Sequence, residues 1–488
     1  MKTLRFDFNN LFSHSIGLGH GISDREFSAV AGALRRANSH LASVISSRED
    51  RVGLGLEWTQ LWRQGAKEVA SIQEFGAQIA ENYSNVLFLG IGGSYLGLKA
   101  AQDALAGAYY NEFSQVRGGL PRIYFEGNNL DPLTLDTLLR NLDPTQTFVV
   151  VISKSGETTE TKAAFMVVEA WLKRSRGSAY GRQIVAITDP SNGSLRKKAD
   201  EARARDPLSF RSLPLLKGVG GRYSELNMGL LHLALIGVDI REVLAGAGAM
   251  FKRCSGAKSS GNPAAMYAAL HTLLFKDKGK NIGIIMPFGE GLKSTADWYC
   301  QLLAESTGKK YARAVGRSRG REQWLPSSRV VNTGRTPIAT RGTNDLHSVQ
   351  QNNIEGRNDK VVTFIRVEKF DEDIVIPGSG DLLSGKSFSR LLSLAQEATE
   401  WALTREQRPN CTISMPGLSP YHWGELIFFF EMATAIEGEL LGINAFDQPG
   451  VEGYKNYMYY KLAKPGLSPE IKKEIAGHPL IRRAKYII

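Results

Sequence analysis

The sequence predicts an α/β protein with two doubly wound domains, each built on a parallel sheet, and with helical extensions at both ends of the chain. Short, continuously apolar segments alternate with longer amphipathic segments, which is typical of parallel strands covered by helices on both faces. The chain has 488 residues, and chains of that length usually divide into more than one domain.

The apolar segments fall into two groups along the chain. In the first group we expect strands at Asn85–Gly90, Arg122–Glu126, Thr147–Ile152 and Gln183–Thr188. In the second group we expect strands at Asn281–Pro287, Val361–Val367 and Cys411–Met415, followed by a buried helix at Tyr421–Leu441.

Polar and turn-rich stretches divide the chain into four predicted segments. Residues 1–60 form a helical extension that is expected to pack on the second domain. Residues 61–245 form the first domain, residues 246–445 the second, and residues 446–488 a C-terminal active-site segment and arm. A Gly-, Ser- and Lys-rich stretch at Lys252–Pro263 marks the expected crossing between the domains.

The formal net charge of +11 suits a partner that is nucleic acid, a membrane surface or a small anion. The basic clusters at Arg196–Arg205, Arg313–Arg321 and Arg482–Lys485 lack interleaved stacking aromatics. We therefore expect no nucleic-acid partner, but a solvated basic surface that attracts anionic small molecules.

The sequence also indicates the compartment. The segment MKTLRFDFNN has no apolar signal core, and no apolar run is long enough to span a membrane. Cys254, Cys300 and Cys411 stand far apart without a CxxC pair, which argues against a disulfide framework. These features predict a cytoplasmic protein with no membrane partner.

Two glycine- and hydroxyl-rich segments follow predicted strands of the first domain. The first, FLGIGGSYLG, places Gly93 and Ser94 where a strand turns into a helix. Glycine lets the backbone approach an anion, and a helix N-terminus offers free N–H groups. Taken alone, this segment is equally consistent with a tight strand-to-helix turn.

The second segment, VVVISKSGETTETKAAF, is more informative. Ser153, Ser155 and Thr158 cluster directly before a predicted helix, with Lys154 among them. One hydroxyl is enough to cap a helix, so this cluster favours a phosphate cradle over a simple cap.

Together, the two segments resemble the sugar-isomerase (SIS) domain over residues 85–190, and a second unit of this kind fits residues 281–440. The resemblance implies a flavodoxin-like sheet whose strand ends hold a phosphosugar. It leaves the activity open, because such domains also occur in regulatory proteins.

Further segments carry candidate residues for chemistry. They are Arg222 in GVGGRYS, Gln301 and Glu305 in CQLLAESTGK, His347 in GTNDLHS, and Gln448 and Lys455 in FDQPGVEGYK. Gln301 and Glu305 are four residues apart, so both project from one face of a predicted helix. Each candidate, taken singly, is more often a surface or structural residue.

The combination of segments is similar to the glucose-6-phosphate isomerase family over nearly the whole chain. GIGGS, ISKSGETTET, GGRYS, AESTGK and FDQPGVEGYK look like its signatures. Gly156 and Pro449 stand where larger relatives carry bulkier side chains, as in the shorter bacterial members.

The resemblance implies reversible isomerisation of glucose 6-phosphate and fructose 6-phosphate, in glycolysis and gluconeogenesis, through ring opening and a cis-enediol. Glu305 would move the proton between C2 and C1, and Arg222 would stabilise the developing negative charge. His347 and Lys455 would exchange protons during ring opening. The implied substrate-binding residues are Gly93, Ser94, Ser153, Lys154, Ser155, Thr158, Glu160, Gln301 and Gln448.

The resemblance further implies that Glu160 orients His347, and that the enzyme is a homodimer in which His347 acts in trans. It implies no cofactor and no metal. Two alternatives remain at this point: a dual phosphoglucose/phosphomannose isomerase, which usually lacks the GGR and DQxGVE segments, and a non-catalytic phosphosugar sensor. The sensor would lack Glu305, Arg222 or Lys455.

Overall fold

The computed structural model of the protein describes residues 2–255, 261–318, 321–378 and 380–488. The chain forms two compact units, Met1–Ala445 (unit 1) and Phe446–Ile488 (unit 2). The predicted boundary between residues 245 and 246 stays a prediction, and the predicted crossing at Lys252–Pro263 lies partly outside the described residues.

The first sheet of unit 1 contains five parallel strands in the order β3-β2-β4-β5-β6. The strands are β2 (Asn85–Leu89), β3 (Arg122–Glu126), β4 (Thr147–Ile152), β5 (Ile184–Thr188) and β6 (Arg211–Pro214). Every residue of β2, β4 and β5 is buried, which explains their continuously apolar sequences. The order is the flavodoxin-like one, in which the second strand lies outside the first.

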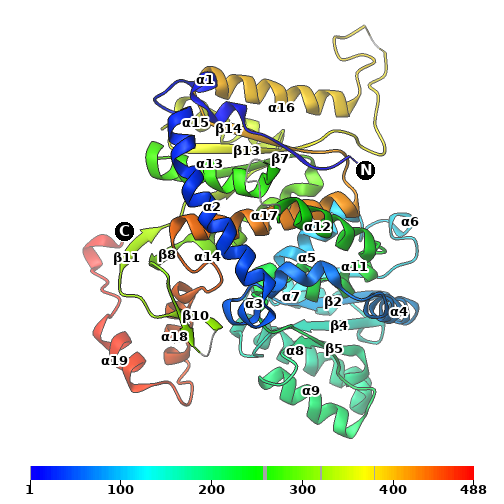
Figure 1. The fold of residues 1–488 in the computed structure, drawn as a ribbon. Helices are drawn as coiled ribbons and strands as arrows, with labels where there is room; N and C mark the ends of the chain where they lie inside the picture. Colours follow the sequence, from blue (N-terminus) through cyan, green and yellow to red (C-terminus); the bar gives the residue numbers. More distant parts are fainter. Residues whose placement is uncertain (1, 256–260, 319–320, 379) are drawn as a thin grey trace. The chain divides into compact units, whose positions relative to one another are not determined.

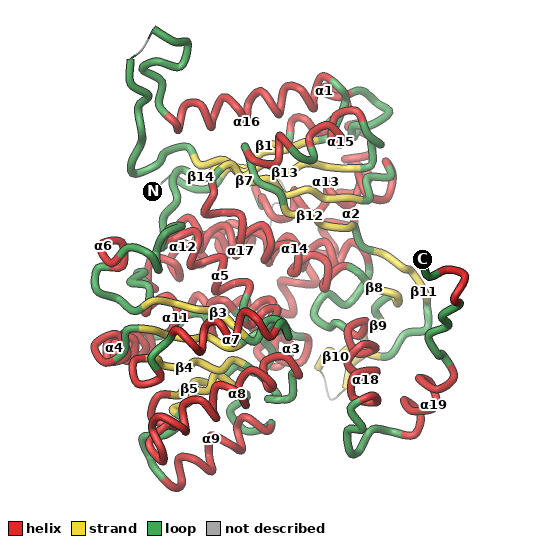
Figure 2. The backbone as a smooth tube through the Cα atoms, turned by 180° about the vertical axis from the view of Figure 1, so that it is seen from behind, coloured by secondary structure: helices red, strands yellow, loops and turns green. Residues whose placement is uncertain are grey.

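Helices cover both faces of this sheet (Figures 1 and 2). Leu87 and Leu89 of β2 belong to the core beneath α8 (Thr159–Arg176), α9 (Ser194–Arg205) and α7 (Pro132–Asn141). Phe88 points the other way and contacts His232 of α11 (Leu230–Leu235). This alternation follows from the two-residue period of a strand.

The second sheet has the order β1-β14-β13-β7-β12. Its strands are β1 (Arg5–Asp7), β7 (Ile282–Phe288), β12 (Thr336–Ala339), β13 (Lys360–Val367) and β14 (Asn410–Met415). β7, β12, β13 and β14 run parallel and repeat the strand order of the first sheet, whereas β1 pairs antiparallel with β14 at the edge. The predicted class of two doubly wound α/β sheets is therefore confirmed.

The N-terminal segment is helical except at its start. α2 (Asp24–Ser46) begins with a capping box between Ser23 and Glu26, and α3 (Arg48–Leu54) and a 3-10 helix η2 (Glu57–Arg63) follow. The strand β1 was not expected, because three residues give too short an alternation to be recognised.

The long apolar segment before the C-terminal unit forms α17 (Pro420–Leu441), as predicted. It is capped by Ser419, ends at Gly442 in the left-handed conformation, and is buried along most of its length. It packs against α12 (Ile240–Cys254), α13 (Pro263–Lys278) and α14 (Lys293–Thr307). On the far side of the second sheet, α15 (Gln350–Glu355) and α16 (Phe388–Arg405) cover β7 and β13.

The remaining elements of unit 1 are shorter or peripheral. They are α1 (Ser13–Ile16), α4 (Ala66–Asn82), α5 (Leu96–Leu105), α6 (Ser114–Arg117), α10 (Glu225–Met228), and the 3-10 helices η1 (Asn9–Leu11), η3 (Gly92–Ser94), η4 (Pro144–Gln146), η5 (Gly177–Gln183), η6 (Gly221–Tyr223), η8 (Glu290–Leu292) and η9 (Asn344–His347). Between α14 and β12, β8 (Lys309–Tyr311) pairs with β11 (Val330–Thr333), and β9 (Ala314–Ser318) pairs with β10 (Arg321–Leu325). Unit 2 contains η10 (Pro449–Val451), α18 (Glu452–Lys461), α19 (Pro469–Gly477) and η11 (Ala484–Tyr486).

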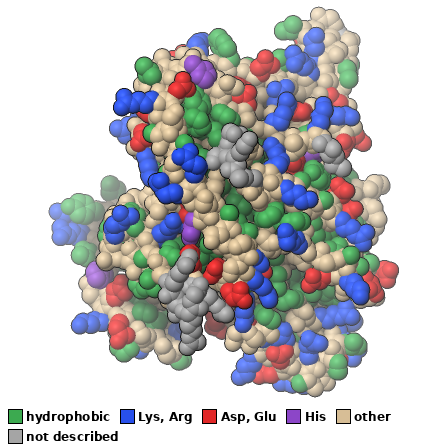
Figure 3. Space-filling view, in the orientation of Figure 1, with side chains coloured by type: hydrophobic (Ala, Val, Ile, Leu, Met, Phe, Trp, Pro, Cys, Tyr) green, Lys and Arg blue, Asp and Glu red, His purple; other side chains and the backbone are tan. Residues whose placement is uncertain are grey.

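The face of the molecule drawn in Figure 3 shows no single dominant basic patch. On the face drawn in Figure 3, Lys and Arg side chains are dispersed and interspersed with Asp and Glu. Within the described ranges, no helix combines the length and apolarity needed to cross a membrane. The three cysteines are free, and burial raises the pKa of each thiol to about 12.

Candidate active site

The site residues gather where the strand order of the first sheet reverses. β2 and β4 are neighbours, but the connections after them lead to opposite faces of the sheet. In open α/β sheets this reversal leaves a crevice at the carboxyl ends of the strands, where ligands bind. The two predicted phosphate segments follow β2 and β4.

The segment after β2 forms η3, and its glycines are required by close packing. A Cβ on Gly93 would lie 2.2 Å from the carbonyl carbon of Gly221 and 2.6 Å from the backbone nitrogen of Arg222. A Cβ on Gly92, whose φ is +57°, would lie 2.8 Å from the Gln301 side-chain nitrogen. The structure therefore brings the GIGGS segment directly against the GGR segment and α14, with Ser94 at the end of η3.

The segment after β4 presents hydroxyls and free backbone groups. Ser153 Oγ accepts from the Gly156 amide over 3.0 Å, and Ser155 Oγ accepts from the Glu157 amide over 3.1 Å. Each hydroxyl keeps its own hydrogen available as a donor. Thr158 is the N-cap residue of α8 but makes no side-chain cap bond, so the simple capping function is wrong for this residue. The first amides of α8 are thereby left available for an anion.

The two segments are tied to one another through Gly127. The Thr161 hydroxyl of α8 donates to the Gly127 carbonyl oxygen over 3.3 Å. A Cβ on Gly127 would lie 3.5 Å from the Gly90 amide nitrogen, which begins the segment after β2. The start of α8 and the start of the GIGGS segment are therefore close neighbours at one edge of the sheet.

Arg222 is 2 % exposed and all three nitrogens of its guanidinium are held. Nε donates to Ser306 Oγ over 2.8 Å, NH2 donates to the Ala445 carbonyl over 2.8 Å, and NH1 donates to Glu305 Oε2 over 3.2 Å. A buried cation needs such partners. The contacts fix the position of its charge before any ligand arrives.

Glu305 and Gln301 lie on the same face of α14, as their spacing predicts. The Gln301 amide donates to Glu305 Oε1 over 3.1 Å. The Glu305 side chain is 29 % exposed, so its carboxylate is both held and accessible. The arrangement places a carboxylate base beside a buried cation, in contact with a phosphate-type loop.

Lys154 and Glu160 flank the hydroxyl cluster. The Lys154 side chain is exposed, while its carbonyl oxygen accepts from the Asp189 amide. Glu160 lies in the first turn of α8 and is partly exposed. Neither is buried in the loop in the way that Ser153 is.

His347 ends η9 and is exposed. Among the described residues of unit 1, none hydrogen-bonds its imidazole, Glu160 included. Two further candidates, Gln448 and Lys455, belong to unit 2. There Gln448 precedes η10, and Lys455 donates to Glu452 over 2.8 Å. Burial lowers the pKa of Lys455, but the ion pair with Glu452 outweighs it and leaves the pKa raised.

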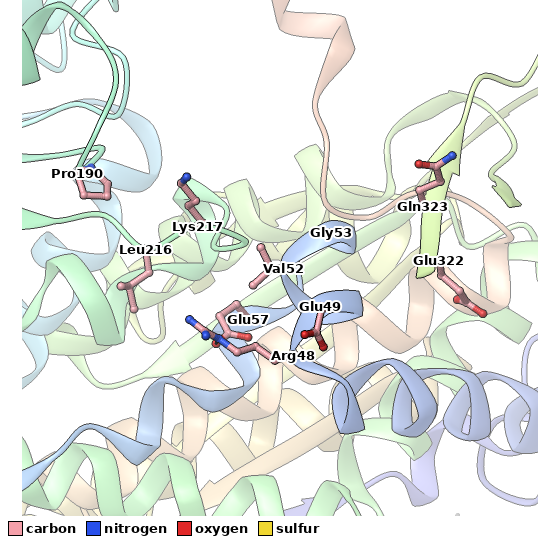
Figure 4. Close-up of a pocket in the computed structure, with 10 residues that line it drawn as sticks. All are labelled: Arg48, Glu49, Val52, Gly53, Glu57, Pro190, Leu216, Lys217, Glu322 and Gln323. Atoms are coloured by element: carbon pink, nitrogen blue, oxygen red, sulfur yellow. The ribbon is translucent and has the colours of Figure 1, made fainter. Parts of the chain in front are cut away.

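A cavity of about 950 Å³ lies elsewhere in unit 1 (Figure 4). Pro190, Leu216 and Lys217 form one side of it and β10 the other, with α3 between them. It contains none of the predicted site residues. In the part of the chain that the structure describes, no group of three or more His, Cys, Asp or Glu side chains could hold a metal ion.

Comparison with known proteins identifies the family. The phosphoglucose isomerase family model matches residues 16–471. The chain belongs to the phosphoglucose isomerase family. A relative from Carboxydothermus hydrogenoformans named glucose-6-phosphate isomerase is 37 % identical over 479 residues, which are 97 % of each chain.

Two solved structures are similar to this chain in fold. A hypothetical protein from Thermus thermophilus is similar with a TM-score of 0.79 and 29 % identity, over 94 % of this chain and 100 % of that one. A glucose-6-phosphate isomerase from Chlamydia trachomatis shares the fold, with a TM-score of 0.74 and 23 % identity, over 93 % of this chain and 89 % of that one.

Sequence reasoning missed the residues that support the site in this family member. Ser306 links the buried Arg222 to the Tyr223 hydroxyl, which lies 3.0 Å from Ser306 Oγ. Glu225 accepts from the Trp298 indole of α14. The available signals were the position of Ser306 next to Glu305, and an acidic residue three positions after Arg222 at the start of a short helix.

Proposed function

We propose that this chain interconverts glucose 6-phosphate and fructose 6-phosphate as an aldose–ketose isomerase. The observation that carries the proposal is the Glu305 carboxylate held 3.2 Å from the buried Arg222 guanidinium, at the sheet edge where two phosphate-type segments meet. The relatives named glucose-6-phosphate isomerase support the choice of substrate.

In the proposed mechanism the phosphate binds first, and its position sets the geometry of the rest. Ser153, Ser155 and Thr158 donate hydroxyl hydrogens to it, together with the free amides of α8; Ser94, Gly93 and Lys154 complete the cradle. Anchoring one end of the sugar places its C2 hydrogen near a fixed base in every productive encounter.

Glu305 then removes the proton from C2 and returns it to C1. The electron pair left at C2 forms the C1–C2 double bond of a cis-enediol, while a second proton, from the C2 hydroxyl, is transferred to the C1 oxygen. One carboxylate can collect and deliver on the same face. Arg222 meets the negative charge that develops on oxygen, with a donor geometry that is already in place. Gln301 holds both Glu305 and a sugar hydroxyl.

Ring opening precedes this step and is assigned to His347, Lys455 and Gln448. His347 and Lys455 exchange protons with the ring oxygen and the anomeric hydroxyl, Glu160 orients His347, and Gln448 binds a sugar hydroxyl. The exposed position of His347, and the absence of a partner for it among the described residues of unit 1, support its use by a second copy of the chain. We therefore propose a two-fold homodimer with His347 in trans, acting in the cytoplasm in glycolysis and gluconeogenesis.

The function is tested by a coupled assay of the purified chain on fructose 6-phosphate and mannose 6-phosphate, with and without a chelator. Turnover of fructose 6-phosphate alone, unaffected by chelation, is expected. Equal turnover of both sugars would indicate the dual isomerase. Binding without turnover would indicate a phosphosugar sensor, and a loss restored by a divalent ion would contradict a metal-free mechanism.

The dimer is tested by co-refolding two inactive variants, Glu305→Gln and His347→Ala. If His347 serves the neighbour's site, each mixed dimer has one site with both defects and one with none. Random pairing makes about half the dimers mixed, so activity should recover to roughly a quarter of the wild-type value. No recovery despite demonstrated subunit exchange would place Glu305 and His347 in one chain's site.

A further inference from the structure

Helix α14 is joined at two points to the segment that carries Arg222. In its last turn, Ser306 accepts from Arg222 over 2.8 Å. Two turns earlier, the Trp298 indole nitrogen donates to Glu225 Oε1 over 2.7 Å. Arg222 pairs with Ser306 and Glu225 pairs with Trp298, so the two segments run antiparallel. Together, the two hydrogen bonds fix both the position and the rotation of α14.

Trp298 lies on the same face of α14 as the residues of the site. Gln301 comes three residues after Trp298 and Glu305 comes seven residues after it, and seven residues make almost two full helical turns. A rotation or a slide of the helix at Trp298 is therefore transmitted to Gln301 and Glu305, about 10 Å along the axis at 1.5 Å per residue.

The structure reserves space for the Glu225 carboxyl group. Glu225 is 2 % exposed and Trp298 is fully buried. A Cβ on Gly97 of α5 would lie 2.3 Å from Glu225 Cγ and 2.6 Å from its Oε1. Glycine within a helix is less stable than alanine. Gly97 therefore destabilises α5 slightly, but it leaves room for the Glu225 carboxyl group.

The surroundings of the Glu225 carboxyl group disfavour its charged form. Burial raises the pKa of Glu225, and burial together with the adjoining Glu225 raises the pKa of Glu431 of α17 well above its ordinary value. Tyr223 of η6 is an ionisable neighbour of both carboxyl groups, and Arg222 in turn lies beside Tyr223. A neutral acceptor can hold the Trp298 indole without competing with Glu305 for the charge of Arg222.

We infer that Glu225 is a positioning residue of the isomerase site, which holds Trp298 and thereby aligns Gln301 and Glu305 with Arg222. The inference rests on the proposed function. It predicts an effect on turnover, because a displacement of about 1 Å at a reacting group can cost on the order of 100-fold in rate. Substrate affinity, which depends on the hydroxyl loop after β4, should change little.

The test compares three variants with the wild type in the fructose 6-phosphate assay. Glu225→Gln keeps an oxygen acceptor for Trp298 and is expected to retain kcat within about threefold. Glu225→Leu and Trp298→Phe each remove the bond and should lower kcat by roughly 10- to 100-fold with KM almost unchanged. The double variant should be no worse than the poorer single variant, because both remove one interaction.

A matched control is Glu169→Leu in α8. Glu169 is also buried, and it accepts from the Tyr180 hydroxyl over 3.0 Å and from Lys198 over 2.6 Å. Its loss should lower the melting temperature without changing the kcat of the folded protein. This separates general destabilisation of the core from misalignment of the site.

The outcomes distinguish the inference from the proposed function. An inactive wild type would contradict the proposed function. An active wild type together with normal kcat in Glu225→Leu, or in Trp298→Phe if Glu225→Leu does not fold, would overturn the inference. A Glu225→Gln variant as impaired as Glu225→Leu would overturn it also, since the hydrogen bond would then not be what matters.

Discussion

The two sheets of unit 1 share the order of four parallel strands but carry different kinds of residue at their carboxyl ends. After β2 and β4 of the first sheet, the chain presents glycines, hydroxyls and backbone amides. After β7 of the second sheet it enters α14, whose Gln301 and Glu305 side chains are held by hydrogen bonds. Under the proposed mechanism, the loops after β2 and β4 anchor the substrate and α14 supplies the base, while Arg222 follows β6 of the first sheet.

The largest effect should come from the second sheet. Glu305→Gln is expected to lower kcat by about 1,000-fold, because an amide cannot accept the C2 proton. Substrate binding and the melting temperature should stay near their wild-type values. Exchange of C2 deuterium into water measures the step directly, and near-normal exchange would exclude Glu305 as the base.

Arg222→Ala should have the next largest effect, lowering kcat by about 100-fold and affecting KM less, since the charge that Arg222 meets develops mainly during reaction. The control is Arg196→Ala, which removes another buried arginine. The Arg196 side chain donates hydrogen bonds to Asp200 and to Ser212 of β6. It should lower stability and leave kcat unchanged. A change confined to KM in Arg222→Ala would make Arg222 a binder of the ground state.

The hydroxyl-rich loop after β4 should respond in the opposite way. Replacing Ser153, Ser155 and Thr158 together by alanine should raise KM by on the order of 100-fold, because three hydrogen bonds are lost at about 1 kcal/mol each, with a smaller effect on kcat. Inhibition by inorganic phosphate should weaken in parallel. Ser191→Ala on the next loop is the control, and unchanged phosphate inhibition in the triple variant would refute the cradle.

The smallest effect concerns stability rather than either sheet's function. His40 lies 2.9 Å from Glu439 and 3.0 Å from Glu322, and the hydrogen bond with Glu439 raises its pKa above the ordinary value. Its contribution is therefore fully present below about pH 6.5 and is lost as the pH rises through the folded-state pKa. Relative to His40→Gln, the wild type should gain about 1 kcal/mol or less at pH 5.5, and nothing at pH 9. Denaturant unfolding measures the difference; a constant difference across this range would contradict it.

The sequence predicts those parts of the molecule whose causes are local. β4 has the predicted bounds, because a buried parallel strand is a continuous apolar run between turns; β3 also has them, although it is only partly buried. Gln301 and Glu305 share a helix face because their spacing dictates it. The two phosphate segments were recognisable because glycines and hydroxyls follow strands directly.

The rest depends on partners far apart in the chain. β1 is a strand because it pairs with the edge strand β14, and a three-residue segment is too short to predict that pairing. Glu225 and Trp298 look like ordinary residues of two helices until the fold brings them together. Sequence reasoning thus finds groups that perform chemistry more readily than groups that hold them in place.

The three native cysteines, of which Cys254 and Cys411 are buried and Cys300 is partly buried, have a practical consequence for spectroscopy. With pKa values raised to about 12 by burial, the native thiols contain almost no thiolate at neutral pH, and the thiolate is the form that reacts with maleimides. A single cysteine introduced on the surface should therefore take up a fluorophore selectively in the otherwise wild-type chain. Donor- and acceptor-labelled preparations could then report subunit exchange by energy transfer, without first removing Cys254, Cys300 or Cys411.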